Sequence, residues 1–190
     1  MQKGDYLTAI LRSDKTVLTF RDIALLWQDT NTAAARVRLN YFVKRGDLCR
    51  IYQGIYTKSN QYDKYEFATR IYTPAYISFE TVLAREGIIF QFQTAIRIAS
   101  YLTRTISVDD QVYEFNKLKD QILMNPIGIE HVKQTSIATK ERAVLDTLYK
   151  NTDYYFDNLR SLDWDRVYEM LPLYANKRMT RIIDRLYKEK

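Results

Sequence analysis

The sequence of 190 residues predicts an α+β protein. Three observations support this prediction. Apolar residues recur with helical spacing over the first 45 residues and are followed by a short alternating segment around Gln53-Gly54. Short apolar runs separated by turn residues then extend from about residue 93 to 138. Helical spacing returns after Thr139, so the predicted strands lie between helical segments, as in an α+β fold.

Three helices are expected in the first 45 residues. Residues 6–11 carry apolar side chains at helical spacing and predict the first helix. A short extended piece is expected next, at residues 16–18. Thr19 and Asp22 then have the spacing of a capping box, which predicts the start of the second helix. The third helix is expected from about residue 32 to 45, after a short polar turn.

A hairpin is expected directly after the third helix. Gly46 suits the end of that helix because glycine adopts the left-handed conformation without strain. Strands are predicted at residues 48–52 and 55–57, joined around Gln53-Gly54. The order of helix, short helix, turn, helix and hairpin is typical of a winged helix-turn-helix, which binds DNA. The sequence therefore predicts such a DNA-binding domain over residues 1–58.

Residues 59–190 are predicted to form a second domain, which is a mixed α+β domain with C-terminal helices. A connecting helix is expected at residues 60–72, and Ser78 is expected to cap the next helix. Strands are predicted between residues 93 and 138. Their apolar positions are Ile96 and Ile98, Val112, Tyr113 and Phe115, Ile122 and Leu123, and Ile137.

Helices are expected to complete the second domain. Thr139 is placed to cap one of them, and two more are predicted at about residues 163–171 and 176–188. Within the first of these helices, Asp146 follows Arg142 by one turn. Asp146 could be a site carboxylate, but an ordinary ion pair with Arg142 is the more common arrangement.

Positive charge is concentrated in one part of the chain. The formal net charge is +6, and residues 1–60 carry ten bases and five acids. The other 130 residues carry 19 bases and 18 acids. Residues 31–58 alone hold six bases and one acid, Asp47, so they account for the whole excess of the first part. Such a local excess is expected of a polyanion-binding module, although a solvated helix face is the alternative interpretation.

The third predicted helix has two distinct faces. Its core-facing positions are predicted to be Ala35, Leu39, Phe42 and Val43. Its outer positions are then Thr32, Ala33, Arg36, Val37, Asn40, Tyr41 and Lys44. Small residues near its N-terminal end would let the helix enter a major groove about 12 Å wide. We predict that base edges are contacted by Thr32, Arg36 and Asn40. We predict that phosphates are contacted by Arg38, Lys44, Arg50 and Lys58.

The sequence contains no motif that demands catalysis, a metal or a cofactor. Its five glycines lie too far apart for a phosphate-binding loop or a dinucleotide fingerprint. The single Cys49 and the single His131 cannot build a zinc site of the Cys/His type. Cys49 is interpreted as a small buried side chain of the hairpin. We therefore expect a protein that is not an enzyme, with no catalytic residues, no metal site and no cofactor.

The sequence favours a cytoplasmic protein with no membrane partner. No run of apolar residues approaches the roughly eighteen that a membrane span requires. The first residues, Met1-Gln2-Lys3-Gly4-Asp5, lack the apolar region of a signal peptide.

Three stretches together resemble a known family. LNYFVKRGDLCRIYQGIY, residues 39–56, is similar to the pattern L…G-x-L-x-R…G-x-Y at the end of a helix and its wing. AYISFETVLAREGII, residues 75–89, resembles the pattern AYISLESAL…GLI. IATKERAVLDTLY, residues 137–149, resembles IASPEKALLDLLY. All three patterns are those of AbiEi-like antitoxins, which are transcriptional regulators of abortive-infection, type IV toxin–antitoxin systems.

The resemblance implies a winged-helix protein that binds double-stranded operator DNA and represses its own operon. It also implies an α+β antitoxin domain that counters a separately encoded nucleotidyltransferase-like toxin. Whether the protein forms a homodimer or binds DNA cooperatively is left open. One alternative is a stand-alone winged-helix transcriptional regulator whose second domain senses a ligand or forms dimers. Another is an enzyme, such as a nuclease, with carboxylates brought together in the second domain.

Overall fold

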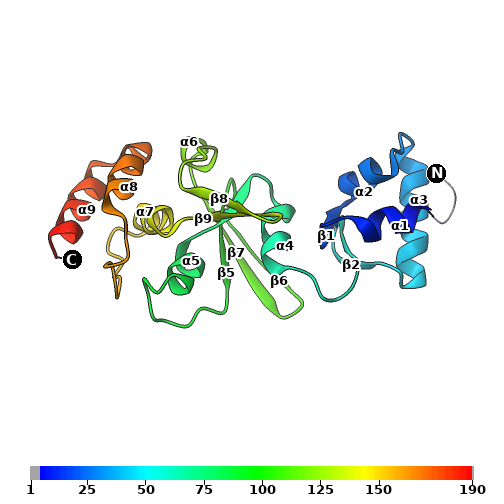
Figure 1. The fold of residues 1–190 in the computed structure, drawn as a ribbon, viewed down its shortest axis with the longest axis horizontal. Helices are drawn as coiled ribbons and strands as arrows, with labels where there is room; N and C mark the ends of the chain where they lie inside the picture. Colours follow the sequence, from blue (N-terminus) through cyan, green and yellow to red (C-terminus); the bar gives the residue numbers. More distant parts are fainter. Residues whose placement is uncertain (1–4, 190) are drawn as a thin grey trace. The chain divides into compact units, whose positions relative to one another are not determined.

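The computed structural model describes residues 5–189, which form helices and two β-sheets and so make an α+β protein (Figure 1). Contacts divide the chain into two compact units, of which the first ends at Ile71 and the second begins at Tyr72. The predicted boundary after residue 58 lies earlier than this division, because helix α4 (Lys64–Ile71) packs with the first unit.

The first unit contains a three-stranded antiparallel sheet in the order β1-β3-β2. Its elements before α4 are α1 (Asp5–Arg12), β1 (Val17–Thr19), α2 (Phe20–Trp27), α3 (Thr32–Arg45), β2 (Cys49–Tyr52) and β3 (Ile55–Thr57). Strand β1 precedes α2 in the chain, but it pairs with β3 of the later hairpin. The sheet therefore joins the start of this unit to its hairpin.

Local capping interactions fix the ends of α2 and α3. Thr19 Oγ1 accepts a hydrogen bond from the backbone N–H of Asp22, at 3.1 Å, and the Asp22 carboxylate accepts one from the backbone N–H of Thr19, at 2.9 Å. The predicted capping box is thus confirmed. The Asn31 side chain accepts from the N–H of Ala34 at 3.1 Å and begins α3. Gly46 ends α3 with a φ of 82°, which glycine adopts without strain.

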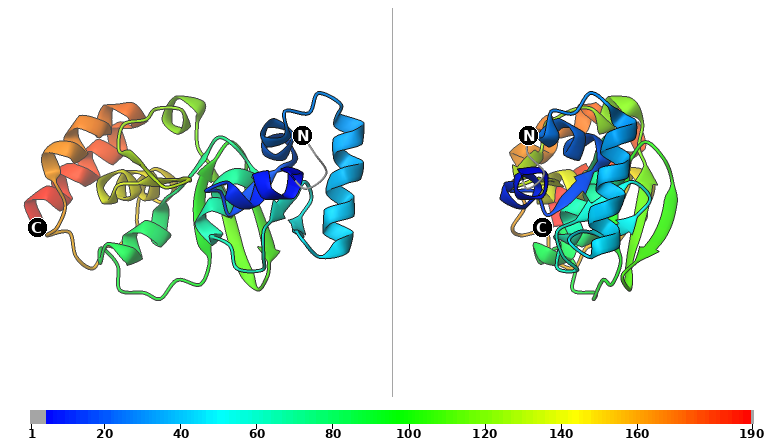
Figure 2. Two further views of the ribbon diagram at one scale, coloured as in Figure 1. Left: turned by 45° about the vertical axis from the view of Figure 1, so that its right-hand side comes forward. Right: turned by 90° about the vertical axis from the view of Figure 1, so that its right-hand side faces the viewer.

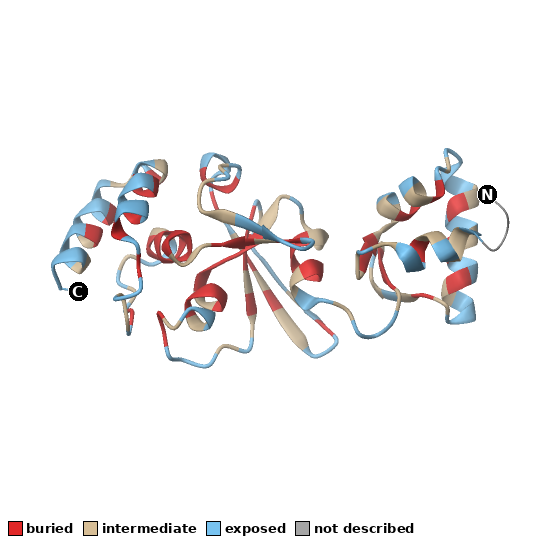
Figure 3. Ribbon diagram, viewed as in Figure 1, coloured by how far each residue is buried: buried red, intermediate tan, exposed pale blue. Residues whose placement is uncertain are grey.

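One face of α3 is buried in the core of the first unit. Ala35, Leu39 and Phe42 of α3 are almost inaccessible, and Val43 packs beside them (Figure 3). The predicted core face of this helix is therefore confirmed. The buried core of the first unit consists of Ile10, Leu18, Ile23, Trp27, Ala35, Leu39, Phe42, Leu48 and Tyr56.

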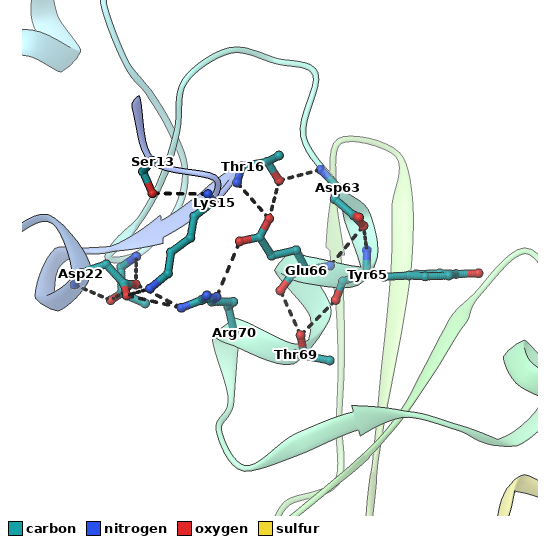
Figure 4. A network of polar contacts seen from close by, with 10 residues as sticks. Ser13, Lys15, Thr16, Asp22, Asp63, Tyr65, Glu66, Thr69 and Arg70 are labelled. Atoms are coloured by element: carbon teal, nitrogen blue, oxygen red, sulfur yellow. Dashed lines mark hydrogen bonds and ion pairs between the residues drawn. The ribbon is translucent and has the colours of Figure 1, made fainter. Parts of the chain in front are cut away.

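A polar network ties α4 to the rest of the first unit (Figure 4). The buried carboxylate of Glu66 accepts hydrogen bonds from the backbone N–H and the hydroxyl of Thr16, at 2.9 and 2.6 Å. Arg70, one turn later, forms ion pairs with Glu66 and with Asp22 of the capping box, at 3.7 and 3.3 Å. Lys15 also pairs with Asp22. These bonds join α4 to α2 and to the residues just before β1, so α4 belongs to the first unit.

The second unit is built on a six-stranded mixed sheet in the order β6-β7-β5-β4-β9-β8. Its strands are β4 (Ala75–Ile77), β5 (Ile96–Ser100), β6 (Arg104–Val108), β7 (Gln111–Lys117), β8 (Ile129–Val132) and β9 (Thr135–Ala138). Its helices are α5 (Phe79–Arg85), α6 (Asp120–Leu123), α7 (Lys140–Lys150), α8 (Trp164–Met170), the 3-10 turn η1 (Leu171–Tyr174) and α9 (Lys177–Glu189). Neighbouring strands are antiparallel except in the parallel pairs β4–β9 and β5–β7.

The structure corrects two predictions for this unit. Ile122 and Leu123, predicted as a strand, lie in the short helix α6, where their N–H groups both donate to the carbonyl of Lys119 at 2.9 Å. A two-residue apolar run cannot distinguish strand from helix, which explains the error. Ser78 holds the N-cap position of α5, as predicted, but its side chain makes no capping hydrogen bond.

The hydroxyl of Ser78 instead belongs to a buried polar cluster around Asp146. The Asp146 carboxylate accepts hydrogen bonds from Tyr174, Ser78 and Tyr76, at 2.6, 2.7 and 2.9 Å. It also pairs with Arg142 at 3.4 Å, and both charged side chains are fully buried. Burial raises the pKa of Asp146, while Arg142 and the three hydroxyls favour its charged form. Asp146 is therefore a structural residue rather than a site carboxylate.

Replacing Asp146 with Asn should leave the buried Arg142 unpaired, because the amide carries no charge. We expect the free energy of unfolding of the second unit to fall by about 3–5 kcal/mol. Urea unfolding followed by Trp164 fluorescence measures this, in a Trp27→Phe background that silences the first unit. In the same background, Asp184→Asn removes an exposed carboxylate and should change stability by less than about 1 kcal/mol. Equal stability of the two variants would contradict the structural role of Asp146.

Candidate nucleic-acid interface

The face of α3 opposite the core is exposed and polar. Thr32, Arg36, Asn40 and Lys44 are all exposed and follow one another at intervals of four residues. Residues four apart are offset by about 40° around a helix, so these side chains form a row about 18 Å long that slants from beside the buried face, at Thr32, to the far side, at Lys44. Ala33, Val37 and Tyr41 are exposed beside them. In the left view of Figure 2, α3 has one side turned away from α1 and α2.

Arg36 is held in place by a ring and keeps its hydrogen-bond donors available. Its guanidinium lies over the Phe20 ring of α2, 4.3 Å from the ring centroid. Among the described residues, Arg36 forms no hydrogen bond or ion pair. An arginine that stacks on an aromatic face can still direct its N–H groups to an external acceptor. The N–H donors of Arg36 are thus not used by any group within residues 5–189.

Cations also surround α3 on its neighbouring elements. Arg50 of β2, predicted to contact phosphate, is exposed. Arg21 of α2 is exposed and follows Phe20, the residue on which Arg36 stacks. Sequence reasoning did not select Arg21, because nothing local indicates that Phe20 packs against α3. Neither Arg21 nor Arg50 forms an ion pair within residues 5–189.

Two of the predicted contacts have structural partners instead. Arg38 pairs with Asp29 at 2.6 Å, and its guanidinium lies 3.8 Å from the centroid of the Tyr6 ring. The hydrogen bond from Arg38 lowers the pKa of Asp29. Lys58 donates hydrogen bonds to the carbonyls of Leu11 and Ser13 at the end of α1. Because their donors hold the first unit together, we leave Arg38 and Lys58 out of the candidate interface.

Cys49, His131 and the Asp109-Asp110 pair lie in different elements of the described chain. Cys49 is a half-buried free thiol in β2. His131 is exposed in β8, where its Nδ1 lies 3.1 Å from the hydroxyl of Ser136. Asp109 and Asp110 form the turn between β6 and β7, both with positive φ. Over residues 5–189, no group of three or more His, Cys, Asp or Glu side chains could hold a metal ion.

Between residues 5 and 189, no helix has the length and apolar content to span a bilayer. Comparison with protein-family models and with curated proteins finds no match to this chain.

Proposed function

We propose that the protein is a DNA-binding transcriptional regulator whose first unit is a winged helix-turn-helix. Helix α3 is the recognition helix, and the β2–β3 hairpin is the wing. The observation that supports this is the exposed row of Thr32, Arg36, Asn40 and Lys44, which runs along α3 beside its buried face. The order α1-β1-α2-α3-β2-β3 and the three-stranded sheet agree with this architecture.

The proposed contacts divide into base and phosphate contacts. Arg36 presents the paired donors that recognise the O6 and N7 acceptors of guanine, and Asn40 matches the N6 and N7 edge of adenine. Thr32 lies one turn earlier, where the N-terminal part of a recognition helix meets the bases. Lys44 and Arg50 are exposed cations suited to the phosphate backbone. Each neutralised phosphate should contribute about 0.9 to the slope of log affinity against log salt concentration.

We further propose that the regulator is an antitoxin that counters a nucleotidyltransferase-like toxin and represses its own operon. This part rests on the resemblance of residues 39–56, 75–89 and 137–149 to AbiEi-like antitoxins. In the last stretch, Arg142 and Asp146 match a basic and an acidic position of the family pattern. These two residues form the buried ion pair of the second unit, so this match concerns the fold of that unit.

Replacing Arg36 with Ala should weaken binding to the cognate duplex by about 1–3 kcal/mol and reduce discrimination against a scrambled duplex. The reason is that the substitution removes a base contact, and only the cognate duplex offers that contact. Titration of both duplexes at fixed salt measures the effect. Lys64→Ala, which removes one exposed cation of the first unit from α4, is the matched control. The proposal is contradicted if the wild type binds both duplexes equally, or if the two variants behave alike.

Val37 should contact the methyl group of a thymine, because it is 72% exposed on the outer face of α3 between Arg36 and Asn40. Replacing the thymines of the cognate site with uracil, one at a time, should weaken wild-type binding about fourfold at one position, as expected for one lost methyl contact. The affinity of the Val37→Ala variant should be the same for the thymine and the uracil duplex at that position. Leu25→Ala, which alters an apolar side chain of α2 that is 68% exposed, should respond like the wild type. Unchanged affinity of the wild type for every uracil duplex would exclude this contact.

Co-expression with the product of the adjacent reading frame tests the antitoxin role. If that product arrests growth, the wild-type protein should restore it. The Arg36→Ala variant should restore growth equally, because the proposed DNA contact lies in the first unit. Growth arrest that persists with both proteins would favour the stand-alone regulator over the antitoxin.

A further inference from the structure

Helix α9 carries a second row of cations, in the second unit. Its buried side is formed by Met179 and Ile183, both with no accessible surface. With 100° between successive residues, the side opposite Ile183 is occupied by five exposed bases. These bases are Lys177, Arg178, Arg181, Arg185 and Lys188. They extend over roughly 16 Å of the helix.

This arrangement is unfavourable for the helix on its own. Lys177 and Arg178 lie in the first turn, where the helix dipole disfavours positive charge. Lys177, Arg181 and Arg185 follow one another four residues apart, and like charges at this spacing repel. Arg178 has an ion pair, with Asp153 at 3.2 Å. For the other four bases, no ion pair is formed with any residue from 5 to 189. Lys188 is favourably placed, because it lies in the last turn and follows Asp184 by one turn, and the exposed acid Glu189 lies at the edge of the same side. The bases in the first half of α9 are therefore not explained by the stability of the helix.

The surroundings of α9 argue against insertion of this helix into a bilayer. An amphipathic helix binds a bilayer through its apolar side. In α9 that side is already buried, and the Tyr187 ring packs against Trp164 of α8 with 5.3 Å between the ring centroids. The outward side also lacks the apolar and aromatic anchors found at the centre of protein interfaces, from which lysine is depleted. A polar surface that is rich in positive charge is instead typical of contacts with nucleic-acid phosphates.

We propose that α9 binds the phosphate backbone of double-stranded DNA through Lys177, Arg181, Arg185 and Lys188. This inference rests on the proposed function, because it assigns to α9 the same class of ligand, double-stranded DNA, that is proposed for α3. The contact reads no bases, so it strengthens binding to every sequence alike. It assigns to the second unit a direct part in DNA binding, besides the proposed antitoxin role.

The test compares two variants of the full chain that lose four positive charges each. The first is Lys177→Gln, Arg181→Gln, Arg185→Gln and Lys188→Gln. The control is Lys117→Gln, Lys119→Gln, Lys133→Gln and Lys150→Gln, which changes four exposed lysines of the second unit outside α9. Affinity for a cognate and a scrambled duplex of 40 base pairs is measured at several salt concentrations. Circular dichroism checks that both variants are folded.

The α9 variant should lower the slope of log affinity against log salt by up to about 3.6, which is four contacts of about 0.9 each. It should weaken binding to both duplexes by the same factor, so the ratio of their affinities should stay at the wild-type value. The control should keep a slope close to that of the wild type. The inference is wrong if the α9 variant keeps the wild-type slope, or if the slope of the control falls as much as that of the α9 variant. The row of bases on α9 would then be assigned to an acidic protein partner. If the wild type binds no duplex, the proposed function itself fails.

Discussion

The structure depends on the burial of one apolar face of α3. Leu39 and Phe42 lie in a core with Trp27, and each such side chain contributes about 1.5–3 kcal/mol when it is fully buried. Rotating α3 so that Arg36 and Asn40 turned inward would expose these side chains and bury a charge, at a cost of several kcal/mol. The packing of the core therefore fixes which side of α3 faces solvent. The proposed DNA contacts follow from that orientation.

Both units contain charged residues that form ion pairs within the fold and charged residues that are exposed. Charges that the fold requires form ion pairs inside it, as Arg38 does with Asp29 and Arg142 does with Asp146. Charges such as Arg36 are left exposed and without an ion pair among the described residues. Arg36 and Arg38 are two positions apart in α3, but only Arg38 forms an ion pair among the described residues. Position along a helix, rather than residue type, thus separates the structural cations from those available to a ligand.

Local signals in the sequence were sufficient for the helix ends of the first unit, but not for its boundary, which tertiary contacts of α4 extend to Ile71. The capping box at Thr19 and the glycine at Gly46 are short-range features, and they place the ends of α2 and α3 correctly. Strand β4 was missed because its three residues are placed by pairing with β5 and β9, both distant in the sequence. Strand β6 pairs with the neighbouring β7. It was not identified because Arg104, Thr105 and Ser107 are polar or charged, so its five residues contain no apolar run.

The same limitation applied to the candidate site. Charge counts correctly identified a cationic segment but could not show which donors were already engaged. Lys58 donates to the carbonyls of Leu11 and Ser13, which lie more than forty residues earlier in the chain. The stacking of Arg36 on Phe20 was also not visible from the sequence, so Arg21 was not considered. Such contacts depend on tertiary structure, whereas the exposed face of α3 follows from helical periodicity alone.

The most direct test of the central claim is to record backbone amide resonances of the protein by NMR, with and without one equivalent of cognate duplex. The account predicts that the largest changes fall in α3, between Thr32 and Lys44, with further changes in the β2–β3 hairpin. Amide resonances of α3 that remain unchanged in the presence of a bound duplex would contradict it.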